Sequence, residues 1–236
     1  MISTIIQYGG TIVVFLVVIY FVTKFNKGAL TQNIAQAKAE NPLPAFAAAM
    51  GLQYQDLSDG SAGDKKVFMD IGSRVYGTYK GFPVEMIFST KAREADKTPI
   101  SAQYSYSYSI QKTVTFTVTN ADGKHFEVLP KSEQIVSTPT GRSAFDAKLV
   151  VTGDNILPGT VLDYFGQLGW MNLTLKGNAL TFHDSFLEQF TGVTAYSRIM
   201  SSVHPVWGTT IQKPAFDLEK GRAFFDKMVE VAQVVS

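Results

Sequence analysis

A long apolar segment near the N-terminus constrains the fold of this chain more than any other feature of its sequence. Residues 5–23 carry no charge, and Gln7 is the only side chain among them more polar than Thr or Tyr. Nineteen residues of α-helix rise about 28 Å, close to the hydrocarbon thickness of a bilayer. We therefore expect a single N-terminal transmembrane helix at residues 5–23, within an anchor that covers residues 1–25.

A cleaved signal peptide is the alternative explanation of this segment. Signal peptides have a positive region before the apolar core and a small-x-small cleavage site after it. Here Lys24 and Lys27 follow the core, and the sequence TKFNKGAL contains no such site. The pattern favours a retained anchor. Because lysines concentrate on the cytoplasmic side of a membrane, it also predicts a single-pass protein with an outside N-terminus and a cytoplasmic C-terminal domain.

Two glycines, Gly9 and Gly10, lie in the outer part of the expected span. Small residues allow a second transmembrane helix to approach closely, so the pair is a candidate contact with another integral membrane subunit. Glycine is also frequent in transmembrane helices that have no such contact, and this alternative stays open. The lipid bilayer is the other partner that the segment predicts.

The charge balance and the lack of cysteine exclude several classes of protein. The 236 residues include 21 Lys and Arg against 20 Asp and Glu, so no basic surplus marks a nucleic-acid-binding surface. The chain has no cysteine, which excludes disulfides, a thiolate nucleophile and cysteine-ligated metals. We therefore expect no nucleic-acid partner.

Beyond the anchor, the sequence predicts a linker and one larger domain. Residues 26–42 contain good helix formers and end at Pro42, which indicates a juxtamembrane linker helix. Residues 43–236 are long enough for a substantial core. Their alternation of helical and strand-like patterns predicts the α+β class, a soluble domain of antiparallel β-hairpins packed with helices.

The elements of this domain follow from apolar periodicity and from turn residues. Lys80-Gly81 and Lys176-Gly177 mark two hairpin turns. The expected helices cover residues 43–50, 158–168, 185–203 and 217–235. The expected strands and hairpins cover residues 52–57, 74–88, 104–118, 125–130, 144–154 and 170–184, with 125–130 returning beside 104–118. Residues 58–66 and 89–102 are expected to be polar connections.

The sequence QYSYSYSI, residues 103–110, opens the longest alternating stretch. From residue 104 to 118 the even positions are aromatic or aliphatic apart from Lys112, and the odd positions are Ser, Thr or Gln. Successive side chains of a strand point to opposite faces, so one face is apolar and the other is rich in hydroxyls. This predicts a half-buried antiparallel strand with a bend or bulge near Lys112, with Phe116 in the core and Tyr104 at its rim.

Tyr104, Tyr106 and Tyr108 of this strand are candidate partner-binding residues. Stacking on nucleic-acid bases would require basic neighbours, but the intervening residues are serines. Core packing is the principal alternative. Recognition of a protein partner is the other, because tyrosine suits surfaces that are apolar on one side and wet on the other.

No pattern predicts catalysis. The chain has no G-x-S-x-G sequence, and His125, His183 and His204 lie far apart and form no HExxH pair. Residues 60–66, GSAGDKK, depart from the spacing of a phosphate-binding loop. We therefore predict no catalytic residues, no cofactor and no metal site.

Two segments share the order helix, glycine, strand. They are residues 46–57 and 163–175, and each leads to a Lys-Gly hairpin. Their residue identity is slight. A duplication with halves 43–142 and 143–236 and a single undivided domain are therefore both open.

Together these features predict a non-enzymatic, single-pass membrane protein that is an accessory or scaffold subunit of a larger membrane complex. Other integral membrane subunits are its expected partners. Two alternatives belong to different classes. One is a membrane-tethered module that binds a small ligand or lipid between helices and sheet, and the other is a membrane-tethered enzyme with residues from scattered positions.

Overall fold

A computed structural model describes residues 41–57, 67–94, 106–132, 135, 138–169, 171–183, 186–192 and 216–236. The chain divides into two compact units, and every described residue except Asn41 belongs to the unit formed by Pro42–Val193 and Ala215–Ser236. The expected transmembrane helix lies outside the described residues, as does nearly all of the expected linker helix. Among the helices of the described part, none is both long enough and apolar enough to span a bilayer.

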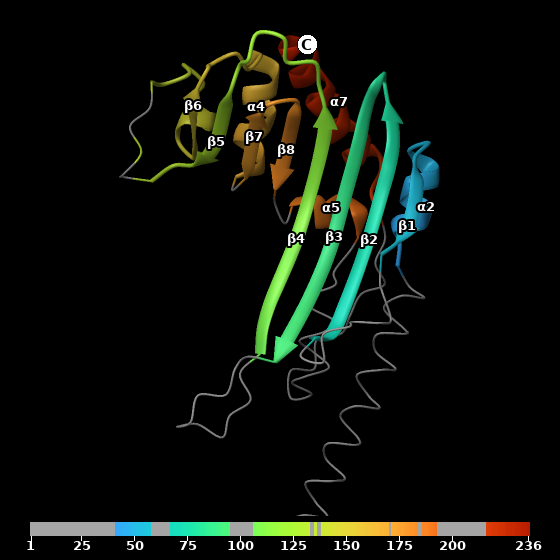
Figure 1. Cartoon of the computed structure of the whole chain (residues 1–236). Coiled ribbons are helices and arrows are strands. Elements are labelled where there is room, and N and C mark those ends of the chain that lie inside the picture. The colour runs from blue at the N-terminus through green and yellow to red at the C-terminus, as the bar shows by residue number, and fades with distance from the viewer. Residues whose placement is uncertain are drawn as a thin grey trace, which may run out of the picture. The chain divides into compact units, whose positions relative to one another are not determined.

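The described unit has the expected α+β class and is built on one eight-stranded antiparallel sheet (Figure 1). The strands are β1 (Gln53–Asp56), β2 (Val67–Tyr79), β3 (Phe82–Glu94), β4 (Tyr106–Thr117), β5 (Phe126–Pro130), β6 (Leu149–Gly153), β7 (Asn172–Lys176) and β8 (Ala179–His183). Their order across the sheet is β1-β2-β3-β4-β8-β7-β5-β6. The helices are α2 (Leu43–Ala49), α3 (Ser143–Asp146), α4 (Gly159–Leu168), α5 (Phe186–Thr191) and α7 (Leu218–Val235).

Helix α2 has the buried face and the glycine end that its sequence predicts. Leu43, Phe46 and Met50 are buried. Gly51 adopts a positive φ of 71° immediately after the helix. The N–H of Leu52 donates to the carbonyl of Ala47 at 2.8 Å, which together with the glycine makes a Schellman motif. The chain is thereby turned directly into β1.

Both predicted hairpins are confirmed, with one shift in a turn. Between β2 and β3 the turn is Lys80-Gly81, and both residues have positive φ, 47° and 91°. This geometry matches the twist of the flanking strands. In the second hairpin Lys176 pairs with Ala179, so the turn residues are Gly177 and Asn178 rather than Lys176 and Gly177. Gly177 supplies the positive φ, 57°.

The alternation predicted for residues 104–118 is confirmed in part where the structure describes side chains. Val114, Phe116 and Val118 are all buried and Thr117 is exposed, but Thr113, on the hydroxyl face, is also buried. The ladder between β3 and β4 continues from Tyr106 to Phe116 without a register shift, so the predicted bulge near Lys112 is wrong. The polar connection predicted for residues 89–102 is also wrong in its first part, because β3 continues to Glu94.

The prediction that residues 125–130 return beside β4 is wrong. Strand β4 pairs with β8, and β5 instead pairs with β6 and β7. The chain after β4 crosses the turn of the β7–β8 hairpin, where the N–H of Val118 donates to the carbonyl of Asn178 at 2.9 Å. The Nδ2 of Asn120 donates to the carbonyl of Gly177 at 3.0 Å. The hairpin therefore occupies the place beside β4 that the sequence assigns to β5.

Residues 143–146 form α3, so the strand predicted for 144–154 is wrong in its first part and correct only from Leu149. The Asp146 carboxylate explains the difference. It accepts hydrogen bonds from the backbone N–H of Thr140 at 3.0 Å and of Gly141 at 3.1 Å, which folds the preceding loop back onto the helical turn. Burial alone raises the pKa of this carboxyl, but these hydrogen bonds outweigh burial and hold the pKa below its usual value.

The C-terminal helices differ in how well the sequence predicts their ends. Helix α5 ends at Thr191, followed by Gly192 with a φ of 69°, so the helix predicted for 185–203 is shorter at this end than expected. Helix α7 begins as predicted. The Asp217 side chain accepts from the N–H of Lys220 at 2.9 Å.

Aromatic rings fill the layer between α7 and the sheet. Phe225 meets Phe116 of β4 at a ring-centroid distance of 5.7 Å, and Phe224 meets Phe182 of β8 at 4.8 Å. The ring centroids of Phe46 in α2 and Phe225 lie 6.4 Å apart, so the same cluster reaches α2. Burial of these rings supplies much of the hydrophobic stabilisation.

Candidate interaction surface

The five residues that the sequence singles out for partner binding are only partly described. Gly9, Gly10 and Tyr104 lie outside the described residues. Tyr106 and Tyr108 are the first and third residues of β4, where they pair with Glu94 and Ala92 of β3. Their register places them at the end of the strand that extends beyond the β4–β8 ladder (Figure 1).

Lys112 is the last residue of this extension before the β4–β8 ladder begins at Thr113. It keeps its even-numbered position in the strand, directly opposite Phe88, which is buried. Its Nζ lies 2.8 Å from Oε1 of Glu188 in α5, and the two side chains are 19% and 24% exposed. Nothing in the sequence indicates that Lys112 and Glu188 pair with each other. An ion pair with α5 accommodates a charge on the apolar face without any bulge.

The two faces of the sheet differ in chemistry across all eight strands. On the face toward α7, one row of directly paired positions is wholly apolar or aromatic: Tyr54, Val75, Met86, Val114, Phe182, Leu173, Val128 and Val151. The adjacent row on the opposite face is wholly polar: Gln53, Tyr76, Glu85, Thr115, Thr181, Thr174, Glu127 and Thr152. We call this second set the polar row.

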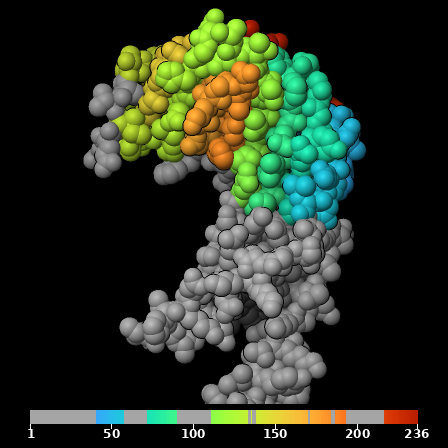
Figure 2. Space-filling view, in the orientation of Figure 1, coloured from blue at the N-terminus to red at the C-terminus, as the bar shows by residue number. Residues whose placement is uncertain are grey.

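Contacts among neighbouring side chains organise the face of the polar row. Thr115 and Thr181 place their hydroxyl oxygens 3.2 Å apart across β4 and β8. The Arg74 guanidinium pairs with the Glu85 carboxylate and lies 4.6 Å from the Tyr76 ring centroid. In Figure 2, β4 and the β7–β8 hairpin reach the surface on this face, with no part of α7 over them. The face thus presents hydroxyls and a neutralised ion pair.

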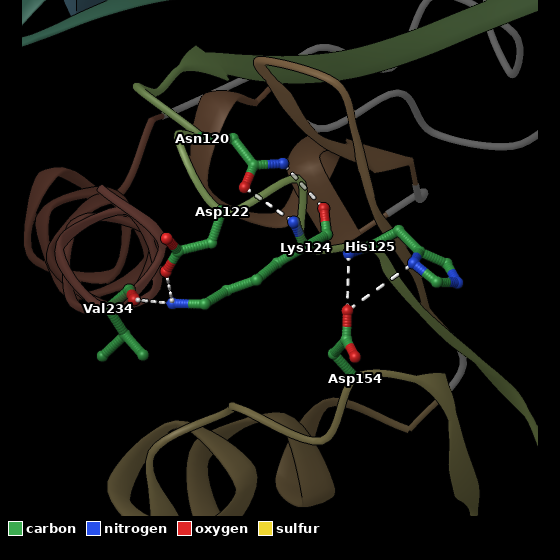
Figure 3. Close-up of polar contacts among 6 residues, drawn as sticks. All are labelled: Asn120, Asp122, Lys124, His125, Asp154 and Val234. Carbon is green, nitrogen blue, oxygen red and sulfur yellow. Dashed lines mark hydrogen bonds and ion pairs between the residues drawn. The ribbon is translucent and has the colours of Figure 1, made fainter.

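The loop between β4 and β5 connects the sheet to the end of α7 (Figure 3). Asn120 accepts from the N–H of Lys124 at 2.9 Å and donates to its carbonyl at 2.7 Å, which closes the loop. The Nζ of Lys124 donates to the carbonyl of Val234 at 3.4 Å and pairs with Asp122 at 3.2 Å. A cation is favourable at the last turn of a helix, so the loop helps to hold α7 in place.

His125 contacts Asp154 through both its backbone and its ring. Its backbone N–H donates to Oδ2 of Asp154 at 2.9 Å, while its ring Nδ1 lies 3.5 Å from the same oxygen (Figure 3). The ring is 76% exposed. His183 lies at the end of β8, paired with Asn172 and Thr113. Among the described side chains, no cluster of three His, Asp or Glu residues could hold a metal ion.

The β2–β3 turn is linked to α7 by Tyr79 and Lys80. The Tyr79 hydroxyl donates to Oδ1 of Asp226 at 2.8 Å, and the Lys80 Nζ lies 2.7 Å from the same oxygen. Burial and this hydrogen bond raise the pKa of Tyr79 to about 12. Burial also raises the pKa of the Asp226 carboxyl, but hydrogen bonds from Lys80 and Tyr79 prevail and hold it below its usual value.

Sequence reasoning did not find the polar row or the Lys112–Glu188 pair. Alternation within each strand predicts which residues of that strand share a face. It does not predict which strands are neighbours, and the row depends on the pairing of β4 with β8 and of β5 with β7. Only the part of the row within the β2–β3 and β7–β8 hairpins carries a local signal.

Comparisons of the chain with protein-family models, with curated proteins and with solved structures found no match. Its function is therefore inferred from its own residues.

Proposed function

We propose that this chain is a single-pass, membrane-anchored accessory or scaffold subunit of a larger membrane protein complex, without catalytic activity of its own. Its N-terminus lies outside and its α+β domain lies at the cytoplasmic surface. The observation that carries the proposal is the apolar segment 5–23, which is followed rather than preceded by lysines. Such a segment has the length and composition of a bilayer-spanning helix.

The two-faced sheet supports a role in protein contact. Its apolar face is covered by helices through the phenylalanine cluster. The face of the polar row offers hydroxyls, an amide, the Arg74–Glu85 ion pair and the exposed Glu127 carboxylate, groups that can form hydrogen bonds with a partner. Tyr106 and Tyr108 extend the sheet beyond this region and remain the proposed partner-binding positions, together with Gly9, Gly10 and Tyr104.

The packing between helices and sheet favours this proposal over a ligand-binding module. A lipid or small-ligand site between α7 and the sheet would need space that is lined but not filled. At this place the rings of Phe116, Phe182, Phe224 and Phe225 lie in direct contact, with centroids 4.8 to 5.9 Å apart along the cluster. Their packing is that of a core.

The duplication with halves 43–142 and 143–236 is a further proposal. Each half contains the order helix, glycine, strand, represented by α2 with β1 and by α4 with β7. One observation counts against the duplication. Strand β5 lies between β6 and β7, so a boundary at residue 142 would place β5 in one half and both of its neighbours in the sheet in the other.

Co-purification of the tagged full chain after mild detergent extraction tests the subunit role. The expected result is a set of integral membrane proteins in fixed stoichiometry. Thr181→Arg, in the polar row, is expected to reduce their recovery, whereas Glu219→Arg, at an exposed position of α7, is expected to leave it unchanged. A chain that purifies without any stoichiometric membrane protein contradicts the proposal.

A further inference from the structure

We propose that residues 106–112 of β4 form a sheet edge that pairs antiparallel with the same residues of a second copy of this chain. Strand β3 pairs with β4 from Tyr106 to Phe116, whereas β8 pairs only with Thr113–Thr117. Among the described residues, no strand continues the sheet beside 106–112 on the side where β8 lies (Figure 1). We call this stretch the β4 edge.

The backbone groups of the β4 edge are oriented for such pairing. Val118 directs its N–H to the β7–β8 turn, where it donates to the carbonyl of Asn178. In an antiparallel sheet, alternate residues direct their N–H and C=O groups to the same neighbouring strand. Because β4 has no register shift, Tyr108, Ile110 and Lys112 direct theirs to the same side as Val118. On that side β8 has already ended.

The β4 edge has few of the devices by which sheet edges usually avoid pairing. Such edges are very short, carry charged side chains, proline or bulges, or are covered by a helix or loop. The two outermost strands, β1 and β6, have four and five residues. The β4 edge has seven residues, no proline and no bulge. Its one charged residue is Lys112, which is engaged by Glu188.

The residues of the β4 edge are complementary to themselves. A two-fold axis through Ser109 places Tyr106 opposite Lys112, Tyr108 opposite Ile110, and Ser107 opposite Gln111. Even positions then meet even positions, so the alternation of the sequence is kept across the interface. No like charges lie directly opposite each other. Symmetric pairing of this kind is the commonest form of homodimer, and it favours a second copy over an unrelated strand.

The inference goes beyond the proposed function, because it concerns the number of copies of this subunit and not its membrane role.

The test of this pairing uses the absence of cysteine from the native chain. In this register Ser109 lies opposite Ser109 of the second copy. The two form a non-hydrogen-bonded pair, in which the Cα atoms are about 4.5 Å apart. A disulfide can span this distance. Mild oxidation of the full-length Ser109→Cys protein, in cells and in detergent extract, is expected to shift most of it to twice the monomer mass.

Two controls make the register itself testable. Ser107→Cys alone is expected to stay monomeric, because the two copies of residue 107 lie about 13 Å apart along the ladder. Mixing Ser107→Cys with Gln111→Cys is expected to restore the cross-linked dimer. A third control, Lys176→Cys at an exposed position at the end of β7, measures how much cross-linking arises from random collision.

Three results would overturn the inference. The first is a Ser109→Cys protein that cross-links no more than the Lys176→Cys control. The second is cross-linking of Ser109→Cys to a different protein, which would assign the edge to a partner strand. The third is efficient cross-linking of Ser107→Cys alone, which would exclude the register centred on Ser109.

Discussion

Lys112 and Glu188 form an ion pair between β4 and α5, with 2.8 Å between Nζ and Oε1. Both side chains are mostly buried, so each charge depends on the other for compensation. The pair links α5 to β4 at the point where the β4–β8 ladder gives way to the strand extension that carries Tyr106 and Tyr108.

Removal of one partner from this pair should destabilise the domain. Glu188→Gln leaves the Lys112 ammonium partly buried without its counter-charge, and the expected loss is about 1–3 kcal/mol in the free energy of unfolding. The double variant Lys112→Met with Glu188→Gln should recover part of the loss. Asp163→Asn, which breaks the exposed Arg142–Asp163 pair, should change stability by less than about 1 kcal/mol. Denaturant unfolding of the three variants measures these differences, and equal losses for Glu188→Gln and Asp163→Asn would contradict the prediction.

The phenylalanine cluster should dominate the stability of the core. Phe224 is fully buried and contacts rings of both β8 and α5. Phe224→Ala is expected to cost about 3–5 kcal/mol. Val234 lies in the same helix but is 42% exposed, and Val234→Ala should stay within about 0.5 kcal/mol. Similar thermal shifts for the two variants would show that α7 packs through a different face.

Two glycines of α4 should respond differently to alanine. A Cβ at Gly166 would lie 2.8 Å from the backbone nitrogen of Phe145, whereas a Cβ at Gly159 would meet only the end of the Arg142 side chain, which can move. Overpacking of this kind costs about 1–3 kcal/mol or more. Helix propensity favours alanine by about 1 kcal/mol at Gly166, in the helix interior, and by less at Gly159, the first residue of α4. Gly166→Ala should therefore destabilise the domain relative to Gly159→Ala, and the reverse order in chemical denaturation would refute the close approach of α3 and α4.

Stability should fall at alkaline pH in a way that depends on Tyr79. The pKa of this residue is raised to about 12 in the folded state, above the value of about 10 for an unfolded tyrosine. A group with a raised pKa contributes stability that is complete below its unfolded pKa and is lost as the pH rises through the folded one. The loss should therefore occur between about pH 10 and pH 12. Tyr79→Phe should flatten this slope, with a remainder from Tyr164, whose pKa burial also raises to about 12. An unchanged slope in the Tyr79→Phe variant would contradict the prediction.

The proposed anchor should be sensitive to charge at its centre. Val17→Arg should cost about 2.5–3.5 kcal/mol of insertion free energy. The measurement is the fraction of the chain that stays with membranes after alkaline extraction, which should fall in Val17→Arg and stay unchanged in Val17→Leu. N-terminal sequencing that starts beyond residue 25, or digestion of the domain by protease added to the outer face, would exclude the anchored topology.

Much of the local structure could be predicted from the sequence. The buried face of α2 and its glycine end, the Asp217 cap of α7 and the Lys80-Gly81 turn all depend on residues within a few positions of one another. The alternation along β4 is equally local, because the side chains of a strand change face at every residue. These features appear in the structure where the sequence places them.

The order of the strands was decided by tertiary packing. The pattern of β5 suits any neighbour with an apolar face, and only the insertion of the β7–β8 hairpin determines that it lies beside β6 and β7 instead of β4. The same holds for the Lys112 charge, whose partner Glu188 comes from a helix distant in sequence. Local alternation determines which side chains of each strand share a face, whereas burial of all the apolar faces against one set of helices selects which strands become neighbours.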